Sequence, residues 1–402
     1  MSEAKLSLDQ VYKASYALRD VARKTAVIQA PMLHPGSKLY LKTENLQITG
    51  SFKVRGAYYK MSRLTDEEKA RGVIACSAGN NAQGVALAAA RNGIPAVICL
   101  PDSAPISKVE ATRSYGAEIC LVKGVYDDAY AKALELRDEQ GYTFIHPFDD
   151  PDVIAGQGTI ALELAEQVPD LGAVVVPIGG GGLISGIAFT LKNLNPSVKV
   201  IGVQASGAPS MLNAMKKHSP ETLERVHTIA DGIAVKRPGD LTYELVSKYV
   251  DEIVTVSDDE ISAAILALME KHKLVTEGAG AVAAAAAMFG KVSPDLGKTV
   301  CVLSGGNIDV TILSRVISRG LLMSGRSCEL VVELVDRPGQ LLMVSKIIAE
   351  QGGNVTRVHH EHTSEGSDIN GCYLRIEMET RDFEHIRQIR SELEKAGLRI
   401  VN

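Results

Sequence analysis

The stretch AVVVPIGGGGLISGIAFTLK, residues 173–192, decides the fold class. Its valine-rich beginning is typical of a strand buried on both faces, and its second half is typical of a helix packed on that strand. The four glycines between them place several backbone N–H groups around one point, with a helix dipole behind. No Gly-Lys-Ser/Thr follows, and G-x-G-x-x-G spacing would need glycine at Ile184 or Ser185. The loop therefore predicts a phosphate site that belongs to neither nucleotide motif.

Similar strand–loop–helix units lie on both sides of this stretch, from about residue 39 to 320. Short apolar runs alternate there with amphipathic or alanine-rich runs, which predicts an α/β fold with parallel sheets covered on both faces. The predicted strands span residues 38–42, 72–76, 95–100, 117–122, 173–177, 198–203, 252–256 and 299–303.

The pattern changes near residues 323–327, where we predict a linker. The elements expected after it are a strand (329–335), a helix (339–351), two strands (355–361 and 371–378), a helix (383–396) and a last strand (398–401). This βαββαβ order predicts a small ferredoxin-like domain.

Composition excludes several classes of protein. The chain has 402 residues, which predicts two or three domains, and a net charge of −5 with no long block of either sign. Nucleic-acid and membrane-surface binding are therefore not expected, and no apolar run is long enough for a membrane span. The mixed-charge N-terminal segment favours a cytoplasmic location. Cys76, Cys99 and Cys301 lie in apolar strands, so we expect buried thiols rather than disulfides.

Three further loops carry residues suited to chemistry. Lys53 lies in TGSFKVRG (49–56), a confined turn where desolvation would lower its pKa and free the amine as a nucleophile. SAGNNAQG (77–84) follows a strand and opens a helix, so it offers either an anion site or simple capping by Ser77 or Asn80. SGGN (304–307) repeats this geometry at the carboxyl end of another strand.

SFKVRGA, SAGNN, GGGGL and SGGN, in this order and spacing, resemble the fold-type II pyridoxal-phosphate enzymes. Residues 10–320 resemble threonine dehydratase (threonine ammonia-lyase), and 328–402 resemble its single ACT regulatory domain. The resemblance implies the tryptophan synthase β-like fold, with two lobes of parallel sheet. The catalytic domain would span 1–322, with a small lobe at about 47–147 inserted into the large lobe.

The resemblance also implies a role for each motif residue. Lys53 would bind pyridoxal 5'-phosphate covalently, Phe52 would pack beside its ring, and Asn80 would bond its ring hydroxyl. Ser304 would meet the pyridine nitrogen. The phosphate would be wrapped by backbone amides, and the substrate carboxylate would be clamped by a second set. These two sets are Gly179, Gly180, Gly181, Gly182 and Leu183 for the phosphate, and Ser77, Gly79 and Asn81 for the carboxylate.

The implied reaction is the dehydration and deamination of L-threonine to 2-oxobutyrate and ammonia, with L-serine as a second substrate. The Lys53 amine would remove the α-proton. A neutral Ser304 at the ring nitrogen would leave the cofactor a weaker electron sink, which favours rapid β-elimination over transamination. Two alternatives stay open: a serine-selective dehydratase or serine racemase, and a non-catalytic amino-acid sensor that keeps the fold.

Departures from the racemase pattern bear on these alternatives. Ala78 stands where racemases carry a second serine, and Phe148 where they carry asparagine. Gln204 and Ser210 replace a carboxylate pair, so we expect no tight divalent-cation site there; a monovalent site stays open.

The ACT resemblance implies a small effector at Asp336, Gly339 and Asn354, between paired domains of a homodimer or homotetramer. A purely oligomerising role is the alternative. Biosynthetic members of the family, which act in isoleucine biosynthesis, respond to isoleucine, and catabolic members respond to other signals including nucleotides. His359, His360 and His362 lie in the same region, but without cysteine or carboxylate spacing they predict no metal site.

Overall fold

The computed structural model describes residues 6–361 and 371–401, so His362 lies outside the described residues. The chain divides into two compact units, an N-terminal unit (Met1–Asp309) and a C-terminal unit (Val310–Asn402). This division precedes helix α13 (Val310–Met323), whereas the sequence suggested a boundary at 323–327. A continuous helix fills the residues before the suggested boundary, and strand β11 begins at Ser327 directly after it.

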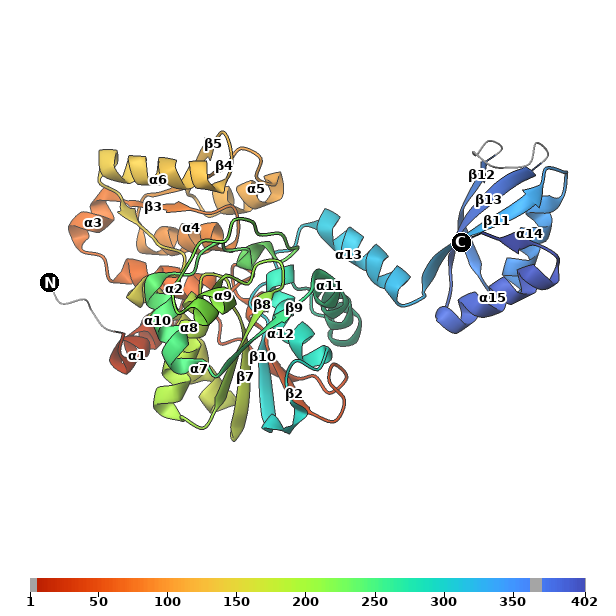
Figure 1. The fold of residues 1–402 in the computed structure, drawn as a ribbon. Helices are drawn as coiled ribbons and strands as arrows, with labels where there is room; N and C mark the ends of the chain where they lie inside the picture. The colour runs from red at the N-terminus through yellow and green to blue at the C-terminus, as the bar shows by residue number, and fades with distance from the viewer. Residues whose placement is uncertain (1–5, 362–370, 402) are drawn as a thin grey trace. The chain divides into compact units, whose positions relative to one another are not determined.

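The large sheet of the N-terminal unit has six strands in the order β1-β2-β10-β7-β8-β9 (Figure 1). They are β1 (Val27–Gln29), β2 (Lys38–Lys42), β7 (Leu171–Pro177), β8 (Lys199–Ala205), β9 (Glu252–Val256) and β10 (Lys298–Val302). All neighbours are parallel except β1 and β2, which confirms the predicted parallel sheet and adds an antiparallel edge strand.

Helices cover both faces of this sheet. Val174 and Val176 of β7 pack in one apolar cluster with residues of α7 (Pro151–Gln167) and α8 (Gly182–Leu194). On the opposite face the thiol of Cys301 contacts the carbonyl oxygen of Ala283 at 3.3 Å, in helix α12 (Gly278–Met288). Coverage on both sides explains why the strands are continuously apolar rather than alternating.

The small sheet contains β3 (Val73–Cys76), β4 (Ala96–Pro101), β5 (Glu118–Val122) and β6 (Thr143–Phe144), all parallel, in the order β5-β4-β3-β6. Helices α2 (Lys53–Ser62) and α4 (Asn80–Asn92) pack with α5 (Ile106–Ser114) on one face, and α6 (Tyr126–Gln140) packs on the other. The predicted burial of Cys76 and Cys99 is confirmed, since both thiols lie in these cores.

The remaining elements of this unit are mostly peripheral helices. They are α1 (Leu8–Ala17), α3 (Asp66–Arg71), α9 (Ser210–Lys217), α10 (Asp240–Tyr249) and α11 (Asp258–Ala267), with short turns at Glu44–Leu46, Asp231–Ile233, Leu268–His272 and Pro294–Leu296. Across residues 6–361 and 371–401, no helix is long and apolar enough to cross a bilayer.

The C-terminal unit confirms the predicted βαββαβ order. Its elements after α13 are β11 (Ser327–Val335), α14 (Gln340–Glu350), β12 (Asn354–Glu361), β13 (Gly371–Glu379), α15 (Phe383–Lys395) and β14 (Arg399–Ile400). The four strands form an antiparallel sheet in the order β12-β13-β11-β14. Apolar side chains of this sheet pack against both helices in a separate core, as expected of a ferredoxin-like domain.

Candidate active site

The turn that carries Lys53 is bonded to the loop that follows β10. The Phe52 N–H donates to the carbonyl of Ser304 at 3.1 Å, and the Gly306 N–H donates to the carbonyl of Gly50 at 2.8 Å. Gly50 has φ +71°, a conformation that favours glycine. Lys53 is therefore fixed at the first residue of α2 and at the carboxyl edge of the large sheet, where open α/β sheets bind ligands.

The amine of Lys53 is desolvated. Its Nζ donates to the carbonyl of Pro147 at 2.8 Å and lies 5.4 Å from the centre of the Phe52 ring. Burial lowers the pKa of Lys53 to about 8, and the charge of Glu277 opposes this shift. A lysine with such a pKa is partly neutral near physiological pH, so its amine is available as a nucleophile and a base.

A chain of amides and a carboxyl group lies beside this amine. The Asn80 Nδ2 donates to Glu277 Oε1 at 2.5 Å, and the Asn307 Nδ2 donates to Asn80 Oδ1 at 2.8 Å. Burial, and secondarily the charge of Asp231, raises the pKa of Glu277 to about 7. Within the described ranges the Glu277 side chain makes no capping bond to α12, and its carboxyl group accepts from Asn80 instead.

The glycine loop is shaped by close packing. A Cβ at Gly180 would lie 2.4 Å from the Phe148 ring, and Gly181 has φ +103°. The Thr242 Oγ1 donates to the carbonyl of Gly180 at 2.6 Å, which fixes the loop from the other side. The amides of Gly182 and Leu183 open helix α8, where the first N–H groups of a helix have no intrahelical acceptor. This arrangement suits a phosphate group.

The residues predicted to bind a carboxylate lie at the start of α4. The Ser77 Oγ accepts from the Gly79 N–H at 3.2 Å, and a Cβ at Gly79 would meet nothing within 4 Å. Asn81 is 6% exposed, and within the described part of the chain its Nδ2 has no hydrogen-bond partner. A buried amide without a partner is costly unless a ligand satisfies it. Among the described residues no side chain caps α4, so the structure does not show the capping alternative for Ser77 and Asn80.

Ser304 is buried, and its Oγ donates to the carbonyl of Ala279 at 3.2 Å. Rotation of this hydroxyl would let it donate to a neutral ring nitrogen instead, and the Ser304 carbonyl accepts from the Phe52 N–H. One residue thus links the end of β10 both to helix α12 and to the Lys53 turn.

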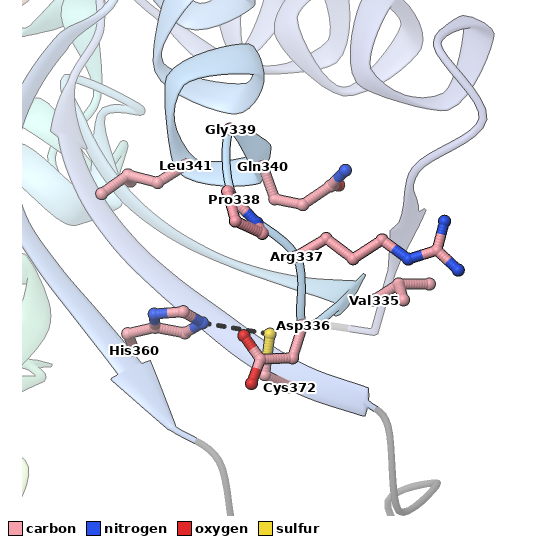
Figure 2. A pocket seen from close by; sticks show the side chains of 9 residues that line it. All are labelled: Val335, Asp336, Arg337, Pro338, Gly339, Gln340, Leu341, His360 and Cys372. Atoms are coloured by element: carbon pink, nitrogen blue, oxygen red, sulfur yellow. Dashed lines mark hydrogen bonds between the residues drawn. The ribbon is translucent and has the colours of Figure 1, made fainter.

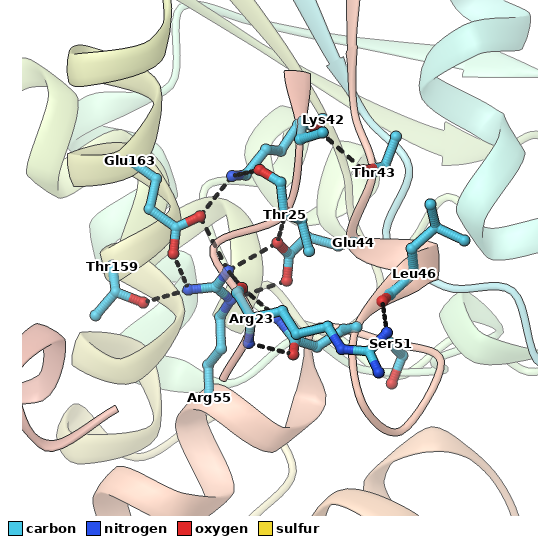
Figure 3. Close-up of polar contacts among 12 residues, drawn as sticks. Arg23, Thr25, Lys42, Thr43, Glu44, Leu46, Ser51, Arg55, Thr159 and Glu163 are labelled. Atoms are coloured by element: carbon cyan, nitrogen blue, oxygen red, sulfur yellow. Dashed lines mark hydrogen bonds and ion pairs between the residues drawn. The ribbon is translucent and has the colours of Figure 1, made fainter. Parts of the chain in front are cut away.

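A buried ion network that sequence reasoning missed surrounds Arg55, two residues after Lys53 in the sequence (Figure 3). The Arg55 guanidinium, 1% exposed, donates to Glu44 Oε1 at 2.8 Å and to Glu163 Oε1 at 2.6 Å. The Lys42 Nζ donates to Glu163 at 2.5 Å and to the carbonyl of Thr25 at 2.8 Å. The network joins α2, β2 and α7, so it anchors the helix that begins with Lys53. Its partners lie far apart in sequence, and no local signal reveals them.

The predicted effector residues are only partly brought together in one copy of the chain. Asp336 and Gly339 line a cavity of about 360 Å³ in the C-terminal unit (Figure 2). Asn354 lies at the other end of the sheet, where its Nδ2 donates to Glu379 Oε2 at 2.9 Å. A site containing all three would need a second copy, as the prediction of paired domains requires.

The catalytic-site residues fit pyridoxal phosphate. Lys53 offers a desolvated amine, and the glycine loop offers backbone amides. The buried Asn81 Nδ2, which has no hydrogen-bond partner among the described residues, offers a further donor. Asn80 and Ser304 supply polar groups between these, so they would hold the ring hydroxyl and ring nitrogen.

Comparison with known proteins agrees with this fit. The family model described as "Pyridoxal-phosphate dependent enzyme" matches residues 18–305, and the chain belongs to this family of cofactor-dependent enzymes. The chain is 48% identical to the L-threonine ammonia-lyase of Thermotoga maritima, over 98% of this chain and 99% of the relative. Within the larger class, it therefore belongs to the threonine ammonia-lyase (threonine dehydratase) family of lyases.

Solved structures show the same relationship. Threonine deaminase isoform 2 of Solanum lycopersicum matches with a TM-score of 0.73 and 40% identity, over 77% of this chain and 92% of that one. Maize serine racemase matches with a TM-score of 0.74 and 35% identity, over 79% of this chain and 98% of that one. The shared fold alone therefore does not separate elimination from racemisation.

Proposed function

We propose that this enzyme converts L-threonine to 2-oxobutyrate and ammonia, and that it accepts L-serine as a slower substrate. The observation that carries the proposal is the buried Lys53 amine, with a pKa of about 8, on a turn bonded to Ser304. The full-length similarity to an L-threonine ammonia-lyase supports the choice of substrate.

The residues divide the work as follows. Pyridoxal phosphate, when bound, supplies an electron sink for negative charge at the substrate α-carbon. Asn81 and the amides at the start of α4 would bind the substrate carboxylate, because that end of the helix favours anions. The Lys53 amine would remove the α-proton. Loss of the β-hydroxyl as water then gives an enamine that hydrolyses to the keto acid and ammonia.

Ala78 supports elimination over racemisation. Its methyl group packs against the apolar core of the small lobe, where a racemase of this group has a serine hydroxyl. Racemisation needs an acid on the face of the substrate opposite the base, and alanine cannot donate a proton.

The direct test follows keto-acid and ammonia release with L-threonine, L-serine and D-serine. We expect the fastest release with L-threonine, slower release with L-serine, and none from Lys53→Ala. Lys60→Ala, a change of the same kind further along α2, is the matched control and should stay active. Racemised serine without keto acid would favour the racemase alternative, and bound cofactor with neither product would favour the sensor.

We further infer that the C-terminal unit regulates the enzyme, which would be a homodimer or homotetramer. A small amino acid would bind at Asp336 and Gly339 of one copy and Asn354 of another. Initial rates measured with added L-isoleucine and, separately, with a nucleotide test this inference. An effect abolished by Gly339→Val supports it, whereas rates that no effector changes would leave the domain a purely oligomerising role.

A further inference from the structure

Three side chains with metal-ligating atoms meet in the C-terminal unit, although the sequence predicted no metal site there. One ligand atom each from Asp336, His360 and Cys372 lies within 4.8 Å of the others, and the His360 Nε2 lies 3.0 Å from the Cys372 Sγ (Figure 2). That expectation considered only spacing along the chain, whereas strand pairing brings Cys372 and Asp336 close to His360.

Strand pairing explains the convergence. His360 of β12 pairs with Leu374 of β13, so Cys372, two residues away, is its diagonal neighbour on the same face. Cys372 itself pairs with Leu334 of β11, and Asp336 follows two residues later. The three ligands therefore come from three backbone segments that the sheet holds in fixed register.

The donor set and the spacing suit zinc. Thiolate, imidazole and carboxylate are the ligands that Zn²⁺ takes in proteins, at about 2.0–2.3 Å, which places ligand atoms of a tetrahedral site about 3.3–3.8 Å apart. The His360 Nε2 and Cys372 Sγ atoms, 3.0 Å apart, lie slightly closer than this, and all three ligand atoms lie within 4.8 Å of one another. Asp336 and His360 are exposed, so small side-chain rotations can bring their atoms to an ion beside the buried Cys372.

We propose that Asp336, His360 and Cys372 bind one zinc ion, with its fourth position open to water or a small ligand. The same three residues line the cavity of about 360 Å³. The ion would tie the loop between β11 and α14 to β12 and β13, and so would restrain one wall of this cavity. This goes beyond the effector proposal, in which His360 and Cys372 have no part.

The test uses the full-length holoenzyme, freed of metal with a chelator and then titrated with Zn²⁺. We expect one tightly bound zinc per chain, and X-ray absorption at the zinc edge should show one sulfur at about 2.3 Å. No stoichiometric binding, or a bound zinc with no sulfur ligand, would overturn the proposal.

Substitutions then assign the ligands. Loss of residues that merely orient a ligand costs about 10–100-fold in metal affinity, so Cys372→Ser and His360→Gln should each raise Kd by about 100-fold or more. His359→Gln is the matched control, because neighbouring side chains of a strand point to opposite faces. Cys328→Ser controls for loss of a thiol in the same unit.

If Cys372→Ser unfolds the unit, the zinc affinities of His360→Gln and Asp336→Asn test the ligand assignment, because both substitutions change exposed side chains. Unchanged affinity in these two would overturn the assignment, and so would an equal loss in His359→Gln. If no effector changes the rate, the effector proposal fails, but zinc binding that depends on Cys372 and His360 would still support the zinc proposal.

Discussion

Two lysines buried in the N-terminal unit show how one residue type serves two purposes. Lys42 is 0% exposed, and its amine donates to Glu163, Gln167 and the carbonyl of Thr25. The Lys53 amine donates to a carbonyl, and within the described ranges no carboxylate lies at salt-bridge distance from it. Burial lowers the pKa of both amines; the charges of Glu163 and Glu44 oppose this shift at Lys42, and the charge of Glu277 opposes it at Lys53. We therefore expect carboxylates at salt-bridge distance to make Lys42 structural, and their absence around Lys53 in the described part of the chain to leave its amine reactive.

Exchanging each lysine for methionine should separate these purposes, with the largest effects expected here. Lys53→Met should lower turnover of L-threonine by at least about 1,000-fold, because it removes both the covalent attachment and the base. The free energy of unfolding of its cofactor-free form should equal or exceed that of the cofactor-free wild type, because the variant no longer buries a desolvated amine. Lys42→Met should do the reverse, keeping turnover per folded molecule while lowering the free energy of unfolding.

Turnover and denaturant unfolding are measured on both variants. We expect Lys53→Met to lose turnover but not stability, and Lys42→Met to lose stability but not turnover. If Lys53→Met destabilises the N-terminal unit as much as Lys42→Met does, the contrast between a reactive and a structural lysine is wrong.

Glu44→Gln tests how much the buried ion network around Lys42 and Arg55 contributes to stability. Arg55 is buried with Glu44, and loss of one partner of a buried ion pair costs about 3–5 kcal/mol because a charge is left uncompensated. We expect a decrease of this size in the unfolding free energy of the N-terminal unit. The double variant Glu44→Gln/Arg55→Met should recover part of the loss. A decrease below about 1 kcal/mol would show that Glu163 alone satisfies Arg55.

The sequence predicted what local pattern determines and missed what long-range pairing creates. The main strands and the ferredoxin-like unit follow from apolar periodicity, whereas β1 and β6, with three and two residues, are too short to show any. The Lys53 turn and glycine loop were recognisable because each is contiguous. The partners of Arg55 and the neighbours of His360 were not, because only strand register and helix packing bring them together.

The raised pKa of Glu277 allows a pH-dependent test of the desolvated site around Lys53. Its carboxyl pKa is raised from 4.5 to about 7, so between these values the folded state keeps a proton that the unfolded state loses. Stability of the cofactor-free enzyme should therefore fall as pH rises through this window, by on the order of 3 kcal/mol.

Glu277→Gln is the control, since its neutral amide can still accept from Asn80. The unfolding free energies of wild type and variant should converge below pH 4.5 and differ fully above pH 7, with the variant more stable. Parallel curves across the whole range would contradict the raised pKa and, with it, the desolvated character of the site.

The smallest effect is expected for Lys24, which is paired but exposed. Its Nζ contacts Glu166, and the two side chains are 55% and 68% exposed. Water already solvates both charges, and ordering two long side chains offsets the weak attraction, so Lys24→Ala should leave the unfolding free energy and turnover unchanged within error. A clear loss of stability would mean that pairing alone makes a lysine structural. No change, beside a loss in Lys42→Met, would show that pairing matters only where burial has first removed the water.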